Sequence, residues 1–251
     1  MDTYGLIGKK LGHSFSKTYF EEKFKSLQIH ARYLNFELDD IRQVKNIIRD
    51  YPELAGLNVT IPYKNSIVDF IDEMDEVAEK VGSVNTLKIE RNRDEISISG
   101  FNTDVIGFEE TLKPILAVRV PVTALILGTG GASNAVGFVL TTLHIPHIFV
   151  SRVPENSAHI GYKDLTPQMI KSHKLIINTS PVGMHPSVYE APDIPYAYVD
   201  RDHILYDLIY NPEETRFLRY GREKGAKTLN GLKMLELQAE ASWKIWNSFC
   251  K

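Results

Sequence analysis

The hydrophobic positions of the first hundred residues follow two periods in turn, that of a strand and that of a helix. Short runs rich in β-branched and aromatic side chains predict strands at residues 3–8, 32–38 and 57–61. Apolar positions that recur every three or four residues predict helices at residues 16–29, 39–50 and 66–82. The first of these helices is expected to bury Tyr19, Phe20, Phe24 and Leu27. Strands and helices that alternate in this way indicate an α/β fold.

A second pattern begins near residue 122, after a hairpin that is predicted from residues 85–90 and 95–102. Residues 122–128 are strongly apolar, as in a strand covered on both faces, and a glycine-rich turn and a helix at residues 133–145 follow. Further short strands are predicted at residues 147–150, 174–178, 203–210 and 226–230. Helical segments separate most of them, so we predict a parallel sheet built from right-handed strand–helix–strand units.

The change of pattern near residues 102–104, with Pro114 and Pro121 soon after, predicts a domain boundary. We expect a first domain at residues 1–102 and a second at residues 103–231. A long amphipathic helix is predicted within residues 232–251, and we expect it to return to the first domain.

Composition narrows the class of protein. The 251 residues are 43% hydrophobic and 24% charged, as in ordinary globular proteins, and the net charge of -3 gives no electrostatic footprint for nucleic acid. No apolar run approaches the roughly 18 residues of a membrane span, and no secretory signal pattern opens the chain. The single cysteine, Cys250, has no internal partner. We therefore expect a cytoplasmic protein that binds neither membranes nor nucleic acid, and we predict no metal site.

The strongest local signal is the turn in VTALILGTGGAS, where Gly128, Gly130 and Gly131 lie between a buried strand and a helix. Glycines allow phosphate oxygens to approach the backbone, and the N–H groups at a helix start stabilise them. Ala132 and Ser133 continue the pattern as small residues. The turn predicts dinucleotide binding, and the alternative is a tight turn without a ligand.

The end of the next strand indicates which dinucleotide binds. NAD sites place an acidic residue there, about 20 residues on, to bond the ribose hydroxyls. Here the strand ends in Ser151 and Arg152, and the first acid is Glu155. An arginine can pair with a 2′-phosphate, so NADP is favoured, unless Arg152 is only a solvent-facing residue.

Lys64 follows a predicted strand in GLNVTIPYKN, residues 56–65. It is either a solvated surface charge or a group aimed at a ligand. Thr60, before the break at Pro62, either offers its hydroxyl to a substrate or is an ordinary strand residue. Asp104, in NTD, either caps the following helix or does chemistry.

Ser14 and Ser16 lie two apart in an extended stretch, so both hydroxyls can point the same way. Capping of the following helix explains Ser16 alone, whereas an anion held at the helix start involves both. Asn85 begins a strand, where its amide either reaches a ligand or completes a turn.

Eight ordered motifs in this chain resemble those of shikimate dehydrogenases. They are GHSFS (12–16), NVTIPYK (58–64), GSVNTL (82–87), GFNTDVIGF (100–108), GTGGAS (128–133), INTSPVGM (177–184), YDLIYNP (206–212) and NGLKMLELQAE (230–240). The resemblance covers nearly the whole chain. It implies an N-terminal α/β substrate-binding domain, a Rossmann-like NADP-binding domain and a cleft between them. It also implies reversible reduction of 3-dehydroshikimate to shikimate with NADPH, a step toward aromatic amino acids.

The resemblance assigns roles to individual residues. Lys64 and Asp104 are implied to face each other as the catalytic pair, with Lys64 exchanging the proton at the substrate oxygen. Ser14 and Ser16 are implied to bind the substrate carboxylate. The other implied substrate contacts are Thr60, Asn85, Tyr210 and Gln238. The implied cofactor positions are Gly128, Gly130, Gly131, Ala132, Ser133, Ser151, Arg152, Leu208, Gly231 and Met234.

Two departures from the family pattern affect these expectations. Lys17 stands where the family usually has proline, which should loosen the helix start slightly, although the extra cation beside the carboxylate site offsets this. After Arg152 the chain has Pro154 and no nearby second basic residue. We therefore expect a missing or remodelled helix there and a weaker preference for NADP.

Three rival interpretations share part of this pattern. A quinate/shikimate dehydrogenase has the same motifs and often uses NAD. A non-catalytic dinucleotide-sensing protein has no need of Lys64 and Asp104. Another two-domain Rossmann enzyme, such as a methylenetetrahydrofolate dehydrogenase, does not fit the motifs at residues 12–16 and 58–64. The favoured expectation is a monomeric or homodimeric enzyme acting on a small molecule.

Overall fold

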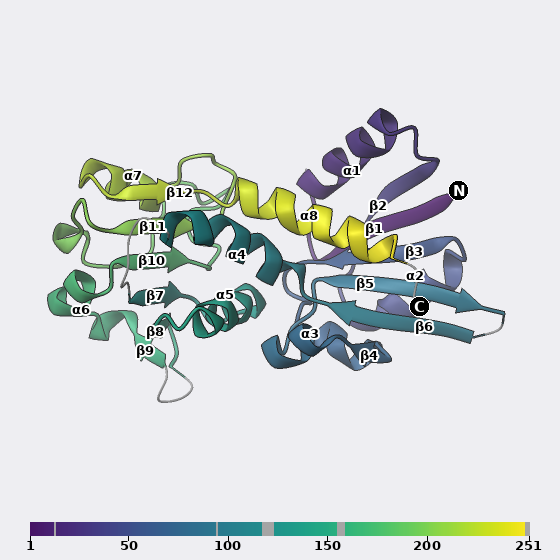
Figure 1. The fold of residues 1–251 in the computed structure, drawn as a ribbon, viewed down its shortest axis with the longest axis horizontal. Helices are drawn as coiled ribbons and strands as arrows, with labels where there is room; N and C mark the ends of the chain where they lie inside the picture. Colours follow the sequence, from purple (N-terminus) through teal and green to yellow (C-terminus); the bar gives the residue numbers. More distant parts are fainter. Residues whose placement is uncertain (13, 94, 117–122, 155–158, 249–251) are drawn as a thin grey trace. The chain divides into compact units, whose positions relative to one another are not determined.

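The computed structural model describes residues 1–251 except residues 13, 94, 117–122, 155–158 and 249–251. Glu155 and Cys250, which entered the sequence argument, lie outside the described residues. The chain forms two compact units, unit 1 of Met1–Thr103 with Gln238–Lys251 and unit 2 of Asp104–Leu237. Each unit contains a six-stranded sheet (Figure 1). In the described part of the chain, no helix is long and apolar enough to cross a bilayer.

Unit 1 has a mixed sheet in the order β2-β1-β3-β5-β6-β4. Its strands are β1 (Asp2–Gly8), β2 (Ala31–Glu37), β3 (Leu54–Val59), β4 (Glu73–Met74), β5 (Thr86–Asn92) and β6 (Glu95–Phe101). Strand β1 pairs in parallel with β2 and β3, whereas β5 runs antiparallel to β3 and to β6. Its helices are α1 (Phe15–Ser26), η1 (Ile41–Gln43), α2 (Val44–Asp50), η2 (Ser66–Phe70), α3 (Glu76–Val81) and the last part of α8 (Leu232–Trp246).

Helix α8 is fixed in unit 1 by Trp246. A Cβ atom at Gly56 in β3 would lie 2.3 Å from Nε1 of this tryptophan, so the glycine leaves the space that the indole fills. The indole N–H donates to the Leu87 carbonyl at 2.9 Å, and the ring stacks on Tyr4 at 4.8 Å between centroids. Phe20 also packs against it. Burial of this aromatic cluster attaches α8 firmly to β1, β3 and α1.

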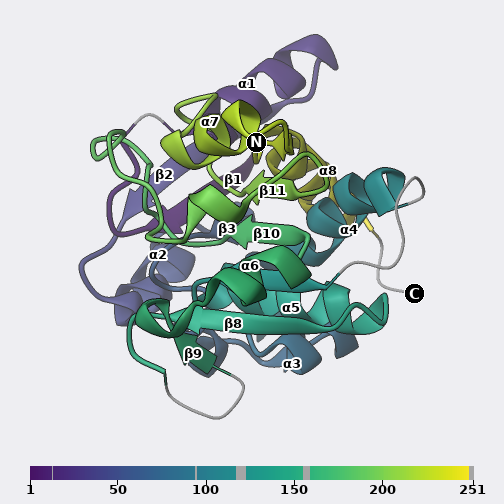
Figure 2. The ribbon, with the colours of Figure 1, turned by 90° about the vertical axis from the view of Figure 1, so that its left-hand side faces the viewer.

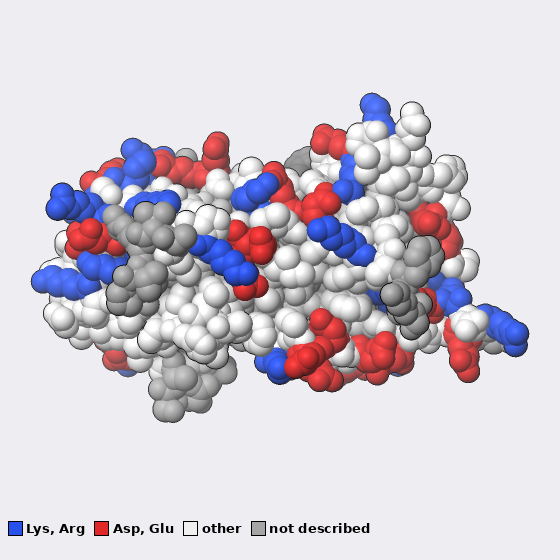
Figure 3. All heavy atoms as spheres, viewed as in Figure 1, with Lys and Arg blue, Asp and Glu red and all other residues white. Residues whose placement is uncertain are grey.

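The face of unit 1 over β4 and α3 is acidic, as Figure 3 shows. Its exposed carboxylates are Asp72, Glu73, Glu76 and Glu79. Glu76 forms an ion pair with Lys80 on the exposed side of α3. Exposed pairs of this kind contribute little to stability, so this face is best explained as a solvated surface.

Unit 2 has a wholly parallel sheet in the order β12-β11-β10-β7-β8-β9. Its strands are β7 (Ala124–Leu127), β8 (His147–Ser151), β9 (His159–Gly161), β10 (Leu175–Asn178), β11 (Ile204–Asp207) and β12 (Lys227–Leu229). Its helices are α4 (Thr103–Leu116), α5 (Gly131–Thr142), η3 (Tyr162–Asp164), α6 (Pro167–Ser172), η4 (Tyr196–Tyr198), α7 (Arg216–Glu223) and the first part of α8. Figure 2 shows this sheet with α6 in front of it. The strand order reverses between β7 and β10, as in Rossmann folds.

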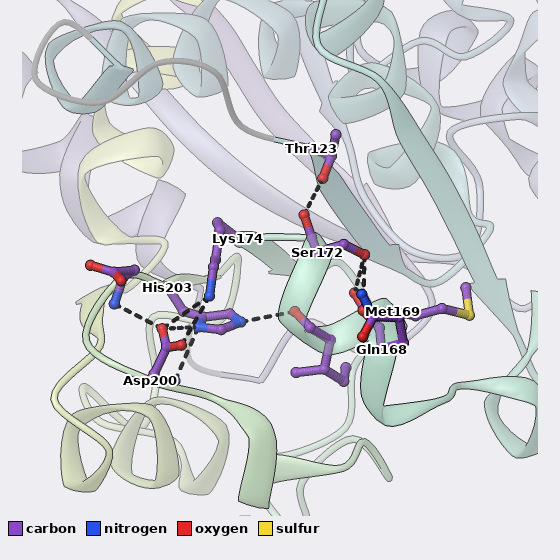
Figure 4. Close-up of polar contacts among 9 residues, drawn as sticks. Thr123, Gln168, Met169, Ser172, Lys174, Asp200 and His203 are labelled. Carbon is purple, nitrogen blue, oxygen red and sulfur yellow. Dashed lines mark hydrogen bonds and ion pairs between the residues drawn. The ribbon is translucent and has the colours of Figure 1, made fainter.

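Lys174 before β10 and the buried His203 before β11 are linked through Asp200 (Figure 4). His203 Nδ1 lies 2.7 Å from Asp200 Oδ1, and His203 Nε2 lies 2.9 Å from the Ile170 carbonyl oxygen. Lys174 bonds the same carboxylate at 3.0 Å. Burial alone would raise the pKa of Asp200, but hydrogen bonds from Lys174 and His203 lower it to about 2. This cluster stabilises the end of the sheet opposite the glycine-rich turn.

The predicted strands and the parallel second sheet are confirmed, but two local predictions are wrong. Residues 66–82 form η2, β4 and α3 in place of one helix, because the backbone N–H and side chain of Asp72 both pair with Ile98 of β6. Asp75 then caps a separate helix through the Ala78 N–H. Leu27 is 58% exposed, because α1 ends at Ser26 and Leu27 is its C-cap.

Candidate active site

In unit 1, main-chain hydrogen bonds bring the segments that carry Thr60, Lys64 and Asn85 together at the end of β3. The Val59 N–H donates to the Asn85 carbonyl at 2.8 Å, and the Val84 N–H donates to the Lys64 carbonyl at 2.8 Å. The Thr60 N–H donates to the Ile7 carbonyl at 2.9 Å. The three predicted residues are therefore held by the backbone of β1, β3 and β5.

The turn between Thr60 and Lys64 is anchored by Tyr63. The Tyr63 side chain is buried and its hydroxyl donates to the Leu38 carbonyl, while its N–H donates to the Thr60 carbonyl at 2.9 Å. Lys64 itself is half-buried. Tyr63 therefore anchors the turn that carries Lys64 to the unit 1 core.

Asn85 is the centre of a buried amide network. Its Nδ2 donates to Gln238 Oε1 at 3.2 Å, and its Oδ1 accepts from the Thr103 N–H at 2.8 Å. Asn85 therefore fixes Gln238 on α8 and the first residue of α4. Asp104, which is buried, is the next residue along that helix. It lies within the first turn, where a carboxylate suits the helix dipole.

A second layer of hydroxyl groups supports this network, and sequence reasoning missed it. Ser242 Oγ lies 2.8 Å from Thr86 Oγ1 and 3.2 Å from Thr103 Oγ1, and Asn58 Nδ2 donates to it at 2.9 Å. Ser242 is fully buried. Its Oγ also bonds the carbonyl of Gln238, one turn earlier on α8, at 2.9 Å. The available signal was a serine one helical turn after Gln238 on an otherwise apolar face.

The structure corrects the capping role that the sequence suggested for Ser16. Ser14 is the N-cap of α1 and accepts from the Lys17 N–H at 3.3 Å, whereas Ser16 lies inside the helix and is buried. Burial raises the pKa of Tyr33, and a hydrogen bond from Ser16 partly offsets that rise. Residue 17 is thus the third helical position and not the first. Its N–H forms the capping bond, which proline has no N–H to make.

In unit 2, the glycine-rich turn has the geometry of a phosphate site. Gly128 has a φ of +132°, and a Cβ there would lie 2.7 Å from Thr179 Oγ1. A Cβ at Gly130 meets no atom within 4 Å, so one side of the turn is open. Helix α5 starts at Gly131, and the Gly130 N–H donates to Ser133 Oγ at 3.1 Å. With Ala132 in the first helical turn, these residues fit a dinucleotide phosphate at a helix N-terminus.

The turn lies where the strand order of the sheet reverses, between β7 and β10. Ligands of open α/β sheets bind at this point, beyond the carboxyl ends of the strands. Thr179 follows β10, and its Oγ1 lies 2.7 Å from Ser133 Oγ. The two loops that border the switch point are therefore joined by a side-chain hydrogen bond.

The predicted selector of NADP lies in a sharp bend after β8. Ser151 is buried and bonds the Val153 carbonyl at 2.9 Å and N–H at 3.2 Å. Arg152 between them is exposed, which leaves its guanidinium accessible to a ligand. Residues 152–158 are all that separate β8 from β9, and the described part of this connection, residues 152–154, has no helix.

Gly231 and Leu208 meet where β11 and α8 approach each other. A Cβ at Gly231 would lie 2.0 Å from the Leu208 carbonyl oxygen, and the Gly231 N–H donates to the Ile209 carbonyl at 3.0 Å. Met234, one turn further along α8, is buried, and Tyr210 is half-buried. Lys64, Thr60, Asn85 and Gln238 thus lie in unit 1, while Asp104, Tyr210 and the cofactor positions lie in unit 2.

Comparison with known proteins agrees with these features. Residues 6–87 match the family model described as "Shikimate dehydrogenase substrate binding domain". The chain is 38% identical to a shikimate dehydrogenase (NADP(+)) of Methanococcus maripaludis, over 96% of this chain and 90% of that protein. It superposes on shikimate dehydrogenase 1 of Peptoclostridium difficile with a TM-score of 0.85 and 36% identity, over 100% and 94% of the two chains.

A third comparison concerns a structure with ligands. A shikimate 5-dehydrogenase of Thermus thermophilus, solved in complex with NADP(H) and shikimate, matches with a TM-score of 0.84 and 26% identity. The match covers 99% of this chain and 94% of that chain.

Proposed function

Because the chain belongs to the shikimate dehydrogenase family, we propose that it catalyses the reversible NADPH-linked reduction of 3-dehydroshikimate to shikimate. This reaction is a step toward aromatic amino acids. The observation that carries the proposal is the network of unit 1, in which one set of hydrogen bonds holds the Thr60–Lys64 turn beside Asn85 and Asn85 beside Gln238. Solvated surface residues have no need of such a network.

Residues 1–102 with the helix of residues 232–251 serve as the substrate domain in this proposal, and residues 103–231 as the cofactor domain. Gly128, Gly130 and the start of α5 hold the NADP phosphates, and Arg152 binds the 2′-phosphate. Leu208, Gly231 and Met234 border the nicotinamide. The near-neutral charge and the lone cysteine fit a cytoplasmic monomer or homodimer that acts on small molecules.

Lys64 and Asp104 carry the proton chemistry. Bound NADPH supplies a hydride to the ketone carbon. Lys64 donates a proton to the ketone oxygen during reduction and accepts it back during oxidation. Asp104 orients the lysine and the neighbouring substrate hydroxyl. The half-buried position of Lys64 and the buried position of Asp104 support these roles, since both are only partly solvated.

The remaining substrate residues bind and orient. Ser14 and Ser16, at the start of α1, hold the substrate carboxylate, where the helix N-terminus also favours an anion. Thr60, Asn85, Tyr210 and Gln238 bind the other polar groups. The carboxylate lies away from the reacting carbon, so its site contributes to binding throughout the reaction.

The Lys64→Ala variant tests this proposal. We expect turnover with shikimate and NADP⁺ to fall by about 10²–10⁴-fold, as for the loss of a general acid–base group. NADP⁺ affinity and melting temperature should stay near wild type, because the Tyr63 side chain, which the substitution leaves in place, anchors the turn. Lys80→Ala, an exposed lysine of the same unit, is the matched control.

Assays should combine shikimate and quinate with NADP⁺ and NAD⁺ in all four pairings. Turnover of Lys64→Ala equal to that of Lys80→Ala would exclude the catalytic assignment. Wild-type protein that oxidises neither substrate would exclude the proposed activity itself.

A further inference from the structure

The last residue of β11, Asp207, is a fully buried carboxylate with neutral hydrogen-bond partners. Its Oδ2 accepts from the Thr215 hydroxyl at 2.6 Å. Its Oδ1 accepts from Asn178 Nδ2 at 3.0 Å and from the Ile209 N–H at 3.1 Å. Burying a carboxylate without a cation is costly, so a position of this kind needs a reason beyond packing.

Asp207 fixes the path of the chain immediately after β11. Its bond to the Ile209 N–H is one of three that hold this segment, because the Leu208 N–H donates to the Asn178 carbonyl at 2.9 Å and the Ile209 carbonyl accepts from Gly231. Leu208 and Tyr210 lie on either side of Ile209. The carboxylate therefore sets the backbone that carries one proposed nicotinamide contact and one proposed substrate contact.

The same carboxylate also reaches the glycine-rich turn through Asn178. Oδ1 of Asn178 accepts from the Ser180 N–H at 3.1 Å and from its hydroxyl at 2.7 Å, which shapes the loop after β10. Thr179 in this loop donates to the Leu127 carbonyl at 2.9 Å and meets Ser133 at 2.7 Å. A continuous set of bonds thus crosses the carboxyl ends of β7, β10 and β11.

We propose that Asp207 is a positioning residue for the reaction, which through Ile209 and Asn178 holds the Leu208–Tyr210 segment and the glycine-rich turn in a fixed relation. This inference rests on the proposed function of the site. Asp207 touches neither substrate nor cofactor in this role. It sets the distance between the residues that bind the phosphates and those that border the nicotinamide.

The charge of Asp207 gives the proposal a measurable signature. Burial raises the pKa of Asp207 to about 7, although Thr215, the Ile209 N–H and Asn178 lower it. Among the described residues, Tyr196 of η4 faces it, and burial and the charge of Asp207 raise the pKa of this tyrosine, so it stays neutral. The ionised carboxylate accepts all three bonds with charge assistance, and protonation weakens them. The pH profile of the activity should therefore contain a limb that rises with pH near 7.

Asp207→Asn mimics the protonated form, because its amide oxygen still accepts from Ile209 and Asn178 while its NH₂ donates to Thr215. We expect this variant to keep its fold, to lose about tenfold or more in kcat with shikimate and NADP⁺, and to lack the limb near pH 7. Asp200→Asn is the matched control, because it alters a carboxylate network at the opposite end of the same sheet. It should lower the melting temperature and leave the pH limb in place.

A second variant covers the case in which Asp207→Asn does not fold. Thr215→Val keeps the carboxylate and removes a donor to it, so the limb should move to higher pH. An unshifted limb in Thr215→Val, a wild-type pH profile in Asp207→Asn, or equal kinetic losses in Asp207→Asn and Asp200→Asn would overturn the proposal. An inactive wild-type protein would overturn the proposed function instead. In that case, NADP⁺ titration still compares cofactor binding among the wild type, Asp207→Asn, Asp200→Asn and Thr215→Val.

Discussion

Replacing Gly231 by alanine tests how closely the segment after β11 must approach the start of α8. The new Cβ would lie 2.0 Å from the Leu208 carbonyl oxygen, 2.5 Å from its carbon and 3.0 Å from its Cα. All three atoms belong to the backbone, so no side chain can rotate away to make room. The two segments must therefore separate by about 1 Å or more before alanine fits.

The separation has an energetic cost that can be estimated. Overpacking of a close contact costs about 1–3 kcal/mol, and the hydrogen bond from Gly231 to Ile209 contributes about 0.5–1.5 kcal/mol. We expect Gly231→Ala to lose roughly 2–4 kcal/mol of unfolding free energy, which for a chain of this size lowers the melting temperature by about 5–15 °C. NADP⁺ should bind at least about tenfold more weakly, because Leu208 and Met234 move apart.

Thermal unfolding and NADP⁺ titration measure the two effects separately. Gly130→Ala is the matched control, because its Cβ meets no atom within 4 Å. It should melt like wild type and still lose NADP⁺ affinity, since its methyl group occupies the open side of the turn. If Gly231→Ala melts within about 1 °C of wild type and binds NADP⁺ normally, the contact between Leu208 and α8 is not the constraint that the geometry indicates.

Three further substitutions test the substrate and cofactor sites. Ser14→Ala and Ser16→Ala should each raise the KM for shikimate about ten- to a hundredfold with little change in kcat, and Ser14→Ala should also lose about 1 kcal/mol of stability as an N-cap. Steady-state kinetics and melting curves separate these effects, and an unchanged KM in both variants would place the carboxylate elsewhere. Arg152→Ala should reduce the preference for NADP⁺ over NAD⁺ about ten- to a hundredfold, and the wild-type preference should fall as salt rises. Catalytic efficiencies at two salt concentrations decide this, and a variant with full NADP⁺ preference would exclude Arg152 as the selector.

The sequence predicted most strands because their burial leaves a local trace. The runs that became β7, β10 and β11 are apolar at nearly every position, as strands covered on both faces must be. The prediction of one helix at residues 66–82 was wrong because apolar residues three or four positions apart fit two structures equally well. One is a single helix, and the other is a short helix, a two-residue strand and a second helix. The deciding bond, from the Ile98 N–H to the Asp72 carboxylate, joins residues that are distant in sequence.

The candidate site likewise contains residues that the sequence could indicate and residues that it could not. Lys64, Asp104 and the glycines belong to short motifs, and the resemblance of these motifs to a known family supplies the prediction of their roles, which stays a prediction. Ser242 matters through partners on three other elements, and no local pattern reveals them. Asp207 can be noticed in the sequence, because a charged residue interrupts the apolar run HILYDLIY. Charged residues are rarely buried, and Asp207 is buried at the end of β11.

The slot at Gly56 that the Trp246 indole fills bears on how the protein is synthesised. The slot is built from β1, β3 and α1, all of which are translated well before Trp246. All of unit 2 is synthesised in between. Until Trp246 is translated, Tyr4 and Phe20 of a nascent chain therefore lack this tryptophan, and Asn85 lacks Gln238 until that residue is translated. Chaperone binding to stalled chains of increasing length should fall only once Trp246 has cleared the exit tunnel.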